Sequence, residues 1–216
     1  MRSSSERGSN CAEGVEDVAQ AKTALRRQMR ARRRALSGEA RACASASVCS
    51  RLAADPAIAH AIETPGRRGA IAIYLASPDE IDLSPFIREM LGRGATVVSP
   101  RWNGETYELA RIAGLSDGDL RKGPMNISEP AVAETVEPGE VAVWILPGLA
   151  FTTDGKRLGY GGGWYDRLLS AARNDAVKIG VAHGFQIVDD LPVAAHDISI
   201  DRVVMDHEPS EYSKRR

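Results

Sequence analysis

Short, uninterrupted apolar runs recur along this chain and constrain its fold more than any other feature. Three of them, at residues 69–76, 141–146 and 177–182, consist almost entirely of apolar or small residues. A strand that is apolar on both faces has to be covered on both sides, as the strands of parallel sheets are. Because segments of helical composition separate these runs, we expect a single α/β domain of three layers, with helices flanking a mostly parallel central sheet.

The N-terminal part of the chain is predicted to be helical. Residues 15–54 are rich in alanine, arginine, leucine and glutamate, which favour helix. Ser37-Gly38 divides this stretch into two helices. The second helix is expected to end near Asp55-Pro56, because the residue before a proline disfavours helical geometry.

Weaker patterns predict the remaining elements. Ser84 is expected to cap a helix that has Pro85 at its first position and Gly92 or Gly94 as its terminator. Further strands are predicted at residues 96–99, 107–112 and 202–205, with 107–112 at an edge of the sheet, a helix at 166–173, and a long surface-exposed connection at 113–140.

Composition argues against several functional classes. The chain has 216 residues, of which 43% are hydrophobic and 26% charged, and its net charge of -1 does not point to nucleic acid or a membrane surface. The basic run at residues 22–34 invites a nucleic-acid interpretation, but no aromatic residues interleave with it, so a solvated helix face is favoured. The cysteines lack metal or disulfide spacing and indicate a reducing compartment. With no signal-like or bilayer-spanning stretch, we expect a cytoplasmic protein.

The two ends of the chain differ in composition from the rest. Residues 1–14 are polar and small, so we expect a disordered leader, and residues 207–216 are expected to form a loose C-terminal tail. Between them, residues 15–206 are predicted to form one domain, which we expect to be a monomer.

A glycine-rich turn ahead of the predicted C-terminal helix carries the clearest chemical signal. Four of the five residues from Gly159 to Gly163 are glycine, and Lys156 and Arg157 precede them. Glycine lets backbone N–H groups approach an anion closely, and the basic side chains would add charge toward a polyphosphate. The turn is not a Walker A loop, because no Gly-Lys-Ser/Thr closes it, and it is not a dinucleotide fingerprint, because Trp164 stands at the last required glycine. A tight turn without a ligand is the alternative, but it would need neither the basic residues nor the flanking aromatics.

The sequence around this turn resembles one family. The string GKRLGYGGGWYDR, which starts at Gly155, is similar to the ATP-phosphate loop of the 5-formyltetrahydrofolate cyclo-ligases, also called 5,10-methenyltetrahydrofolate synthetases. Other segments of the chain are also similar to the family and occur in the family's order, between about residue 21 and residue 205. They are Lys22-x-x-x-Arg26, Tyr74-Leu75 with Asp79-Glu80-Ile81-Asp82, Pro100-Arg101, Ile127-x-Glu129-Pro130, and His196-Asp197 with Asp201-Arg202-Val203-Val204.

This resemblance implies a fold, an activity and a set of ligands. The fold would be Rossmann-like and similar to that of NagB/RpiA/CoA-transferase-like proteins. The activity would be the ATP- and Mg²⁺-dependent cyclisation of 5-formyltetrahydrofolate to 5,10-methenyltetrahydrofolate, with release of ADP and phosphate, through a phosphorylated formyl intermediate. Mg²⁺ would be the cofactor and ATP a co-substrate. The partners would be these small molecules, with no nucleic acid and no membrane.

The resemblance also implies roles for individual residues. Arg157 and Tyr160 would be catalytic, and Asp166 and Asp201 would bind Mg²⁺, which prefers oxygen ligands. ATP binding is implied for Lys22, Arg26, Arg157, Leu158, Gly159, Tyr160, Gly161, Gly162, Gly163, Trp164 and Tyr165. Substrate binding is implied for Leu75, Glu80, Tyr160, Gly161, Gly162, Gly163 and Trp164.

Two alternatives to the cyclo-ligase remain open. One is a non-catalytic relative that binds folate or nucleotide, and the other is a different ATP-dependent or CoA-transferase-type activity on the same kind of sheet. Trp164 stands where the family more commonly has tyrosine or phenylalanine, and Tyr160 stands where some members have arginine. His183, directly after an apolar run, is a candidate for lining the cleft. The phosphate loop, the two carboxylates and Glu80 together favour the enzyme.

Overall fold

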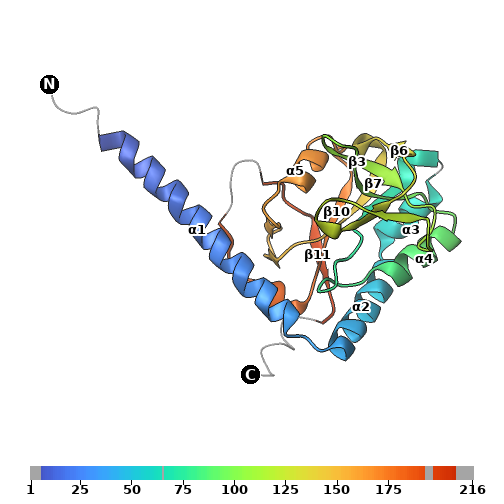
Figure 1. Cartoon of the computed structure of the whole chain (residues 1–216), viewed down its shortest axis with the longest axis horizontal. Helices are drawn as coiled ribbons and strands as arrows, with labels where there is room; N and C mark the ends of the chain where they lie inside the picture. The colour runs from blue at the N-terminus through green and yellow to red at the C-terminus, as the bar shows by residue number, and fades with distance from the viewer. Residues whose placement is uncertain (1–5, 65, 193–196, 208–216) are drawn as a thin grey trace.

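Seven strands form one central sheet in the computed structural model, which describes residues 6–64, 66–192 and 197–207 (Figure 1). These strands are β1 (Ala70–Ile73), β2 (Val97–Trp102), β3 (Tyr107–Arg111), β6 (Thr135–Val136), β7 (Val141–Leu146), β10 (Val177–Ala182) and β11 (Arg202–Met205). Their order across the sheet is β11-β10-β7-β1-β2-β3-β6. In this order, the five strands from β11 to β2 run parallel to one another. β3 then pairs antiparallel with β2, and β6 pairs antiparallel with β3.

Two antiparallel strand pairs lie outside this sheet. β4 (Leu120–Lys122) pairs with β5 (Ser128–Pro130), and β8 (Ala150–Phe151) pairs with β9 (Arg157–Leu158). The β8–β9 hairpin follows β7 closely and leads into the glycine-rich turn. The hairpin therefore determines where that turn lies relative to the sheet.

Helices cover both faces of the sheet. The helices are α1 (Glu6–Arg34), α2 (Gly38–Ala53), α3 (Pro56–Glu63), α4 (Ser84–Gly92) and α5 (Trp164–Leu169). Side chains of α2, α3 and α4 are buried with Ile71 and Ile73 of β1, while α5 is buried with Ala70 and Ala72 on the opposite face. Alternate residues of one strand thus enter two separate cores, as the period of two predicts for a sheet covered on both sides.

The long helix α1 packs against the rest of the domain through its C-terminal half (Figure 1). Met29 is 2% exposed and belongs to a small apolar cluster with Leu149, Leu158 and Phe185. Arg33, one turn further along the helix, is equally buried. Through this contact α1 brings basic side chains to the segments that follow β7 and β10.

The fold class predicted from the sequence is confirmed, and so are most of its elements. The three apolar runs form β1, β7 and β10, and the last predicted strand is β11. Two helices separated near Ser37 occupy the N-terminal part, and Asp55 caps the helix that follows them.

The differences concern short elements whose pairing depends on distant residues. The segment 113–140 contains β4, β5 and β6 and buries Glu129, so it is not simply a surface connection. Because β6 pairs with β3, residues 107–112 do not form the edge of the sheet. α3 was not predicted, and α5 begins at Trp164 and ends at Leu169, earlier than expected. Short strands and helices are stabilised by tertiary contacts that local composition does not reveal.

The ends of the chain are only partly described. α1 begins at Glu6, inside the segment for which composition indicates a disordered leader. Residues 1–5, 193–196 and 208–216, which include His196 and most of the expected tail, lie outside the described residues. The division into leader, domain at 15–206 and tail stays a prediction. Within the described ranges, none of the helices combines the length and apolar character that a bilayer crossing requires.

Candidate active site

The candidate site residues gather where the parallel strands end. Glu80 follows β1, the glycine-rich loop follows β7 and its hairpin, and His183 follows β10. Because these strands are parallel, their carboxyl ends meet at one edge of the sheet, the usual position of ligand sites in open α/β sheets.

The glycine-rich loop, residues 159–163, requires its glycines. Gly161 and Gly163 have positive φ angles of 106° and 64°, a backbone conformation that is strained for other residues. A Cβ atom on Gly162 would lie 2.4 Å from Nε1 of Trp164. Other residues at these positions would therefore strain the loop backbone or displace Trp164.

Backbone N–H groups of the loop are available to a ligand. Among the described residues, no backbone carbonyl accepts a hydrogen bond from the N–H groups of residues 160–163. The three residues Gly161, Gly162 and Gly163 are exposed. A run of N–H groups without internal acceptors provides donors for an anion such as a phosphate.

An ion pair joins the two sides of this loop. Nη2 of Arg157, before the loop, lies 2.8 Å from Oδ1 of Asp166, after it, and Nη1 of Arg157 donates to the carbonyl of Pro147 at 3.3 Å. The Arg157 side chain is only 4% exposed, and its Nε has no hydrogen-bond partner among the described residues. Arg157 is thus a buried cation held directly beneath the loop, with the adjacent Leu158 buried in the core.

Helix α1 supplies two further cations at the loop. Nε of Arg26 donates to the carbonyl oxygen of Gly159 at 3.0 Å. One helical turn earlier, Nζ of Lys22 lies 2.7 Å from Oδ2 of Asp197. The structure therefore brings together Lys22, Arg26 and Arg157, which the sequence resemblance groups as ATP ligands.

Tyr160 connects the loop to the segment after β1. Its hydroxyl donates a hydrogen bond to Oε1 of Glu80, whose Oε2 accepts from the backbone N–H of Ser77 at 2.8 Å. Although Tyr160 is 38% exposed as a residue, desolvation of its hydroxyl and the neighbouring Glu80 carboxylate raise its pKa well above the ordinary value, against the opposing effect of Arg33. The hydroxyl therefore remains a hydrogen-bond donor to Glu80. Tyr160 and Glu80, both of which the resemblance implies for substrate binding, thus lie in direct contact although they are distant in sequence.

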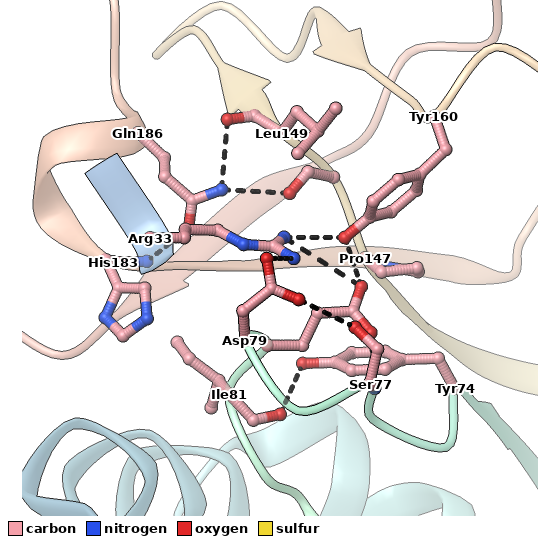
Figure 2. Close-up of polar contacts among 12 residues, drawn as sticks. Arg33, Tyr74, Ser77, Asp79, Ile81, Pro147, Leu149, Tyr160, His183 and Gln186 are labelled. Carbon is pink, nitrogen blue, oxygen red and sulfur yellow. Dashed lines mark hydrogen bonds and ion pairs between the residues drawn. The ribbon is translucent and has the colours of Figure 1, made fainter. Parts of the chain in front are cut away.

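Sequence analysis did not identify Arg33 as a site residue. Figure 2 shows its guanidinium between Asp79 and Tyr160, with Nη2 3.0 Å from Oδ2 of Asp79 and Nη1 donating to the Tyr160 hydroxyl at 2.6 Å. The signal that could have found it is helical spacing, because residues 22, 26 and 33 lie on one face of α1.

An aromatic cluster adjoins the loop on its other side. Trp164 makes edge-to-face contacts with Trp102 at 5.6 Å and Tyr107 at 5.1 Å between ring centroids. The guanidinium of Arg167 lies 3.9 Å from the centroid of the Trp164 ring. Trp164 was predicted as a site residue from the sequence, but Trp102 and Tyr107 were not. These two residues face each other as partners in the antiparallel β2–β3 pair.

Two predicted substrate or nucleotide contacts are more enclosed than expected. Leu75 is 8% exposed and belongs to the core on the α2–α4 face. Burial also raises the pKa of Tyr165, whose ring lies 5.8 Å from the Arg157 guanidinium. Both side chains border the site from within the domain, and their roles as direct contacts stay predictions.

The two predicted metal ligands lie in different settings. Asp166 is 23% exposed and stands at the glycine-rich loop beside Arg157. Asp201 precedes β11, at the amino ends of β10 and β11, where Oδ2 accepts from the Lys178 backbone N–H at 2.6 Å. Asp197, which lies a few residues before Asp201, contacts Lys22. It therefore lies against the face of α1 that also carries Arg26.

The donor set at the loop is compatible with Mg²⁺ bound together with phosphates. In the described ranges, His, Cys, Asp and Glu side chains form no group of three or more suited to a metal. Mg²⁺ needs no such group, since it is commonly bound by one or two carboxylates together with substrate phosphates and water. Asp166 offers such a carboxylate at the loop.

His183 is buried at the carboxyl end of β10. Its side chain is 2% exposed, Nδ1 lies 3.0 Å from Oδ2 of Asp206, and its ring stacks on Phe185. Burial tends to raise the pKa of Asp206, but hydrogen bonds from His183 and the Gly184 N–H outweigh it and lower that pKa. A buried histidine fixed in this way does not line an open cleft.

Comparison with known proteins gives a consistent result. A family model for the 5-formyltetrahydrofolate cyclo-ligase family matches residues 18–206. A 5-formyltetrahydrofolate cyclo-ligase from Mus musculus is 30% identical over 204 residues, covering 89% of this chain and 97% of the mouse protein. The 5-formyltetrahydrofolate cyclo-ligase of Escherichia coli K12 is 29% identical over 182 residues, covering 82% of this chain and 95% of that protein.

A solved structure extends the similarity to three dimensions. The NMR structure of Aquifex aeolicus 5,10-methenyltetrahydrofolate synthetase matches with a TM-score of 0.73 and 34% identity, covering 87% of this chain and 90% of that one. Because the family model spans most of the sequence and the fold agrees, this chain belongs to the 5-formyltetrahydrofolate cyclo-ligase family, as its glycine-rich motif predicts, and is an enzyme of the ligase class.

Proposed function

We propose that this enzyme uses MgATP to convert 5-formyltetrahydrofolate into 5,10-methenyltetrahydrofolate, releasing ADP and phosphate. The observation that carries the proposal is the glycine-rich loop, which lies beside Arg26 and Arg157 and whose N–H groups at residues 160–163 have no backbone acceptor in the described part of the chain. The names of the relatives support the folate substrate and product.

The reaction requires the formyl oxygen to become a leaving group. In the proposed sequence this oxygen attacks the γ-phosphorus of ATP, the bond to the β-phosphate oxygen breaks, and ADP leaves. The product of this step is an iminium phosphate at N5. The lone pair of N10 then attacks the activated carbon, N10 loses its proton, and the C–O bond breaks to release phosphate. Phosphoryl transfer of this kind depends chiefly on positioning and on neutralisation of charge.

The loop and its cations would supply that positioning. Backbone N–H groups of residues 160–163 would donate to phosphate oxygens, and Arg157 and Arg26 would balance their charge. Lys22, one turn from Arg26, would add a third cation. Because Arg157 is fixed by Asp166 and Pro147, its guanidinium needs little reorganisation when a phosphate binds.

Mg²⁺ would be held at the loop by Asp166. When bound, the ion would neutralise phosphate charge. For a second carboxylate the chain offers Asp201, which the family resemblance implies, and Asp197. We favour Asp197, because it contacts Lys22 beside the loop, whereas Asp201 lies at the amino ends of β10 and β11.

The folate would lie between the loop and the segment after β1. Glu80 would accept a hydrogen bond from the pterin, and Trp164 with its aromatic neighbours would provide an apolar face for a ring. Tyr160 contacts Glu80 and belongs to the loop, so it would adjoin both substrates. We further propose that the enzyme acts as a monomer in the cytoplasm on these small molecules.

The first prediction concerns the activity itself. Purified protein mixed with 5-formyltetrahydrofolate and MgATP should form the methenyl product, detected as a rise in its near-ultraviolet absorption band, and EDTA should prevent the rise. A protein that binds both substrates without any Mg²⁺-dependent rise would instead be a non-catalytic binding relative.

The second prediction concerns the shape of the loop. Gly162→Ala should weaken binding of a non-hydrolysable ATP analogue by about tenfold or more, because the added methyl group would displace Trp164 or the loop backbone. Gly92→Ala is the matched control, since a Cβ there has no neighbour within 4 Å. Calorimetric titration measures both affinities. Equal affinities for the two variants would contradict the proposed phosphate cradle.

The third prediction separates the candidate metal ligands. Asp166→Asn and Asp197→Asn should each raise the Mg²⁺ concentration for half-maximal activity by about tenfold, because each removes a carboxylate charge. Asp201→Asn should behave like the unmodified enzyme, since asparagine can still accept from Lys178. An increased Mg²⁺ requirement in Asp166→Asn and Asp201→Asn, with none in Asp197→Asn, would restore the pair of ligands implied by the family resemblance.

A further inference from the structure

Arg33 is a buried cation that the proposed reaction does not yet use. Its side chain is 3% exposed and lies near the C-terminal end of α1. The next residue, Arg34, is exposed to solvent. The sequence favours a solvated face for this basic part of the helix, but Arg33 does not belong to such a face, because its side chain is buried.

The contacts of Arg33 are with groups already placed at the folate side of the site. Nη2 lies 3.0 Å from Oδ2 of Asp79, Nη1 donates to the Tyr160 hydroxyl at 2.6 Å, and Nη1 lies 4.0 Å from Oε1 of Glu80 (Figure 2). The Tyr160 hydroxyl in turn donates to Oε1 of Glu80. One guanidinium thus contacts a carboxylate, a phenol and a second carboxylate at the same time.

Charge explains why these groups stay together. Asp79 and Glu80 are consecutive in sequence, and Arg33 is a cation in contact with both carboxylates. Burial tends to raise the pKa of Asp79, but the attraction and hydrogen bond of Arg33 outweigh it and lower that pKa. Without Arg33, the carboxylates of Asp79 and Glu80 would lose the cation that contacts both of them, and the Tyr160 hydroxyl that donates to Oε1 of Glu80 would lose its own donor.

Stability alone is a poor explanation for this arrangement. A buried ion pair has to offset the desolvation of both charges, and apolar replacements are often equally stable. Nε of Arg33 has no hydrogen-bond partner among the described residues, so the guanidinium is not fully compensated. The Arg33 guanidinium can orient Glu80 and Tyr160 through its charge and its hydrogen bond, which an apolar side chain cannot do.

We infer that Arg33 is a positioning residue for the folate pocket, which holds the Glu80 carboxylate and the Tyr160 hydroxyl in the arrangement that receives 5-formyltetrahydrofolate. The inference rests on the proposed function for the identity of this ligand. Arg33 acts through Glu80 and Tyr160, whereas Arg26 and Arg157 contact the phosphate loop and its flanks.

The test compares Arg33→Met with Arg34→Met by calorimetric titration. Arg33→Met should bind 5-formyltetrahydrofolate about tenfold more weakly, because a buried charged hydrogen-bond donor is lost, while its affinity for a non-hydrolysable ATP analogue changes by less than about threefold. Arg34→Met should bind both ligands like the unmodified enzyme. A residue that only stabilised the fold would not separate the two affinities in this way.

A conservative variant keeps the test informative if Arg33→Met does not fold. Arg33→Lys retains the charge but cannot contact Asp79 and Tyr160 with two nitrogens of one planar group, so its folate affinity should fall by about threefold to tenfold. Folate affinity equal to that of the unmodified enzyme in a folded Arg33 variant, or equal losses for folate and nucleotide, would overturn the inference. If the unmodified enzyme does not bind 5-formyltetrahydrofolate, the proposed function itself fails, and the inference with it.

Discussion

The ion pair between Arg157 and Asp166 closes the glycine-rich loop, and the rest of the candidate site depends on this closure. The two residues flank the loop in sequence, and their charged groups are 2.8 Å apart. Charge-assisted hydrogen bonds of this length are strong, and removing Asp166 would leave the buried Arg157 guanidinium without its carboxylate partner. With its two sides fixed, the loop keeps a shape in which, among the described residues, no backbone carbonyl accepts a hydrogen bond from the N–H groups of residues 160–163.

Helix α1 completes the site from the other end of the chain. Lys22, Arg26 and Arg33 lie at spacings of four and seven residues and therefore on one helical face. Their contacts differ along the helix, because Arg26 binds a backbone carbonyl of the loop, whereas Arg33 binds the Tyr160 hydroxyl and the Asp79–Glu80 segment. A single rigid element thus links the proposed nucleotide and folate sides of the site. This arrangement explains how residues far apart in sequence can act on one reaction.

The sequence could predict the sheet and the loop because both depend on local signals. The apolar runs of β1, β7 and β10 are continuous, and the glycines stand next to the basic residues that accompany them. The settings of Asp197 and Asp201 could not be distinguished, because the two are only a few residues apart and their difference depends on where β11 begins. The role of Arg33 could not be predicted from the basic run at residues 22–34. Its burial depends on contacts with Asp79 and Tyr160, which are distant in sequence.

The central claim is that the backbone of residues 159–163 holds the phosphates of ATP. Nuclear magnetic resonance of ¹⁵N-labelled protein during titration with a magnesium-loaded, non-hydrolysable ATP analogue measures this most directly. The amide signals of Tyr160, Gly161, Gly162 and Gly163 should move downfield and exchange more slowly with solvent, while that of Gly92 should stay in place. If the analogue binds and the loop amides do not respond, the phosphates lie elsewhere and the account is contradicted.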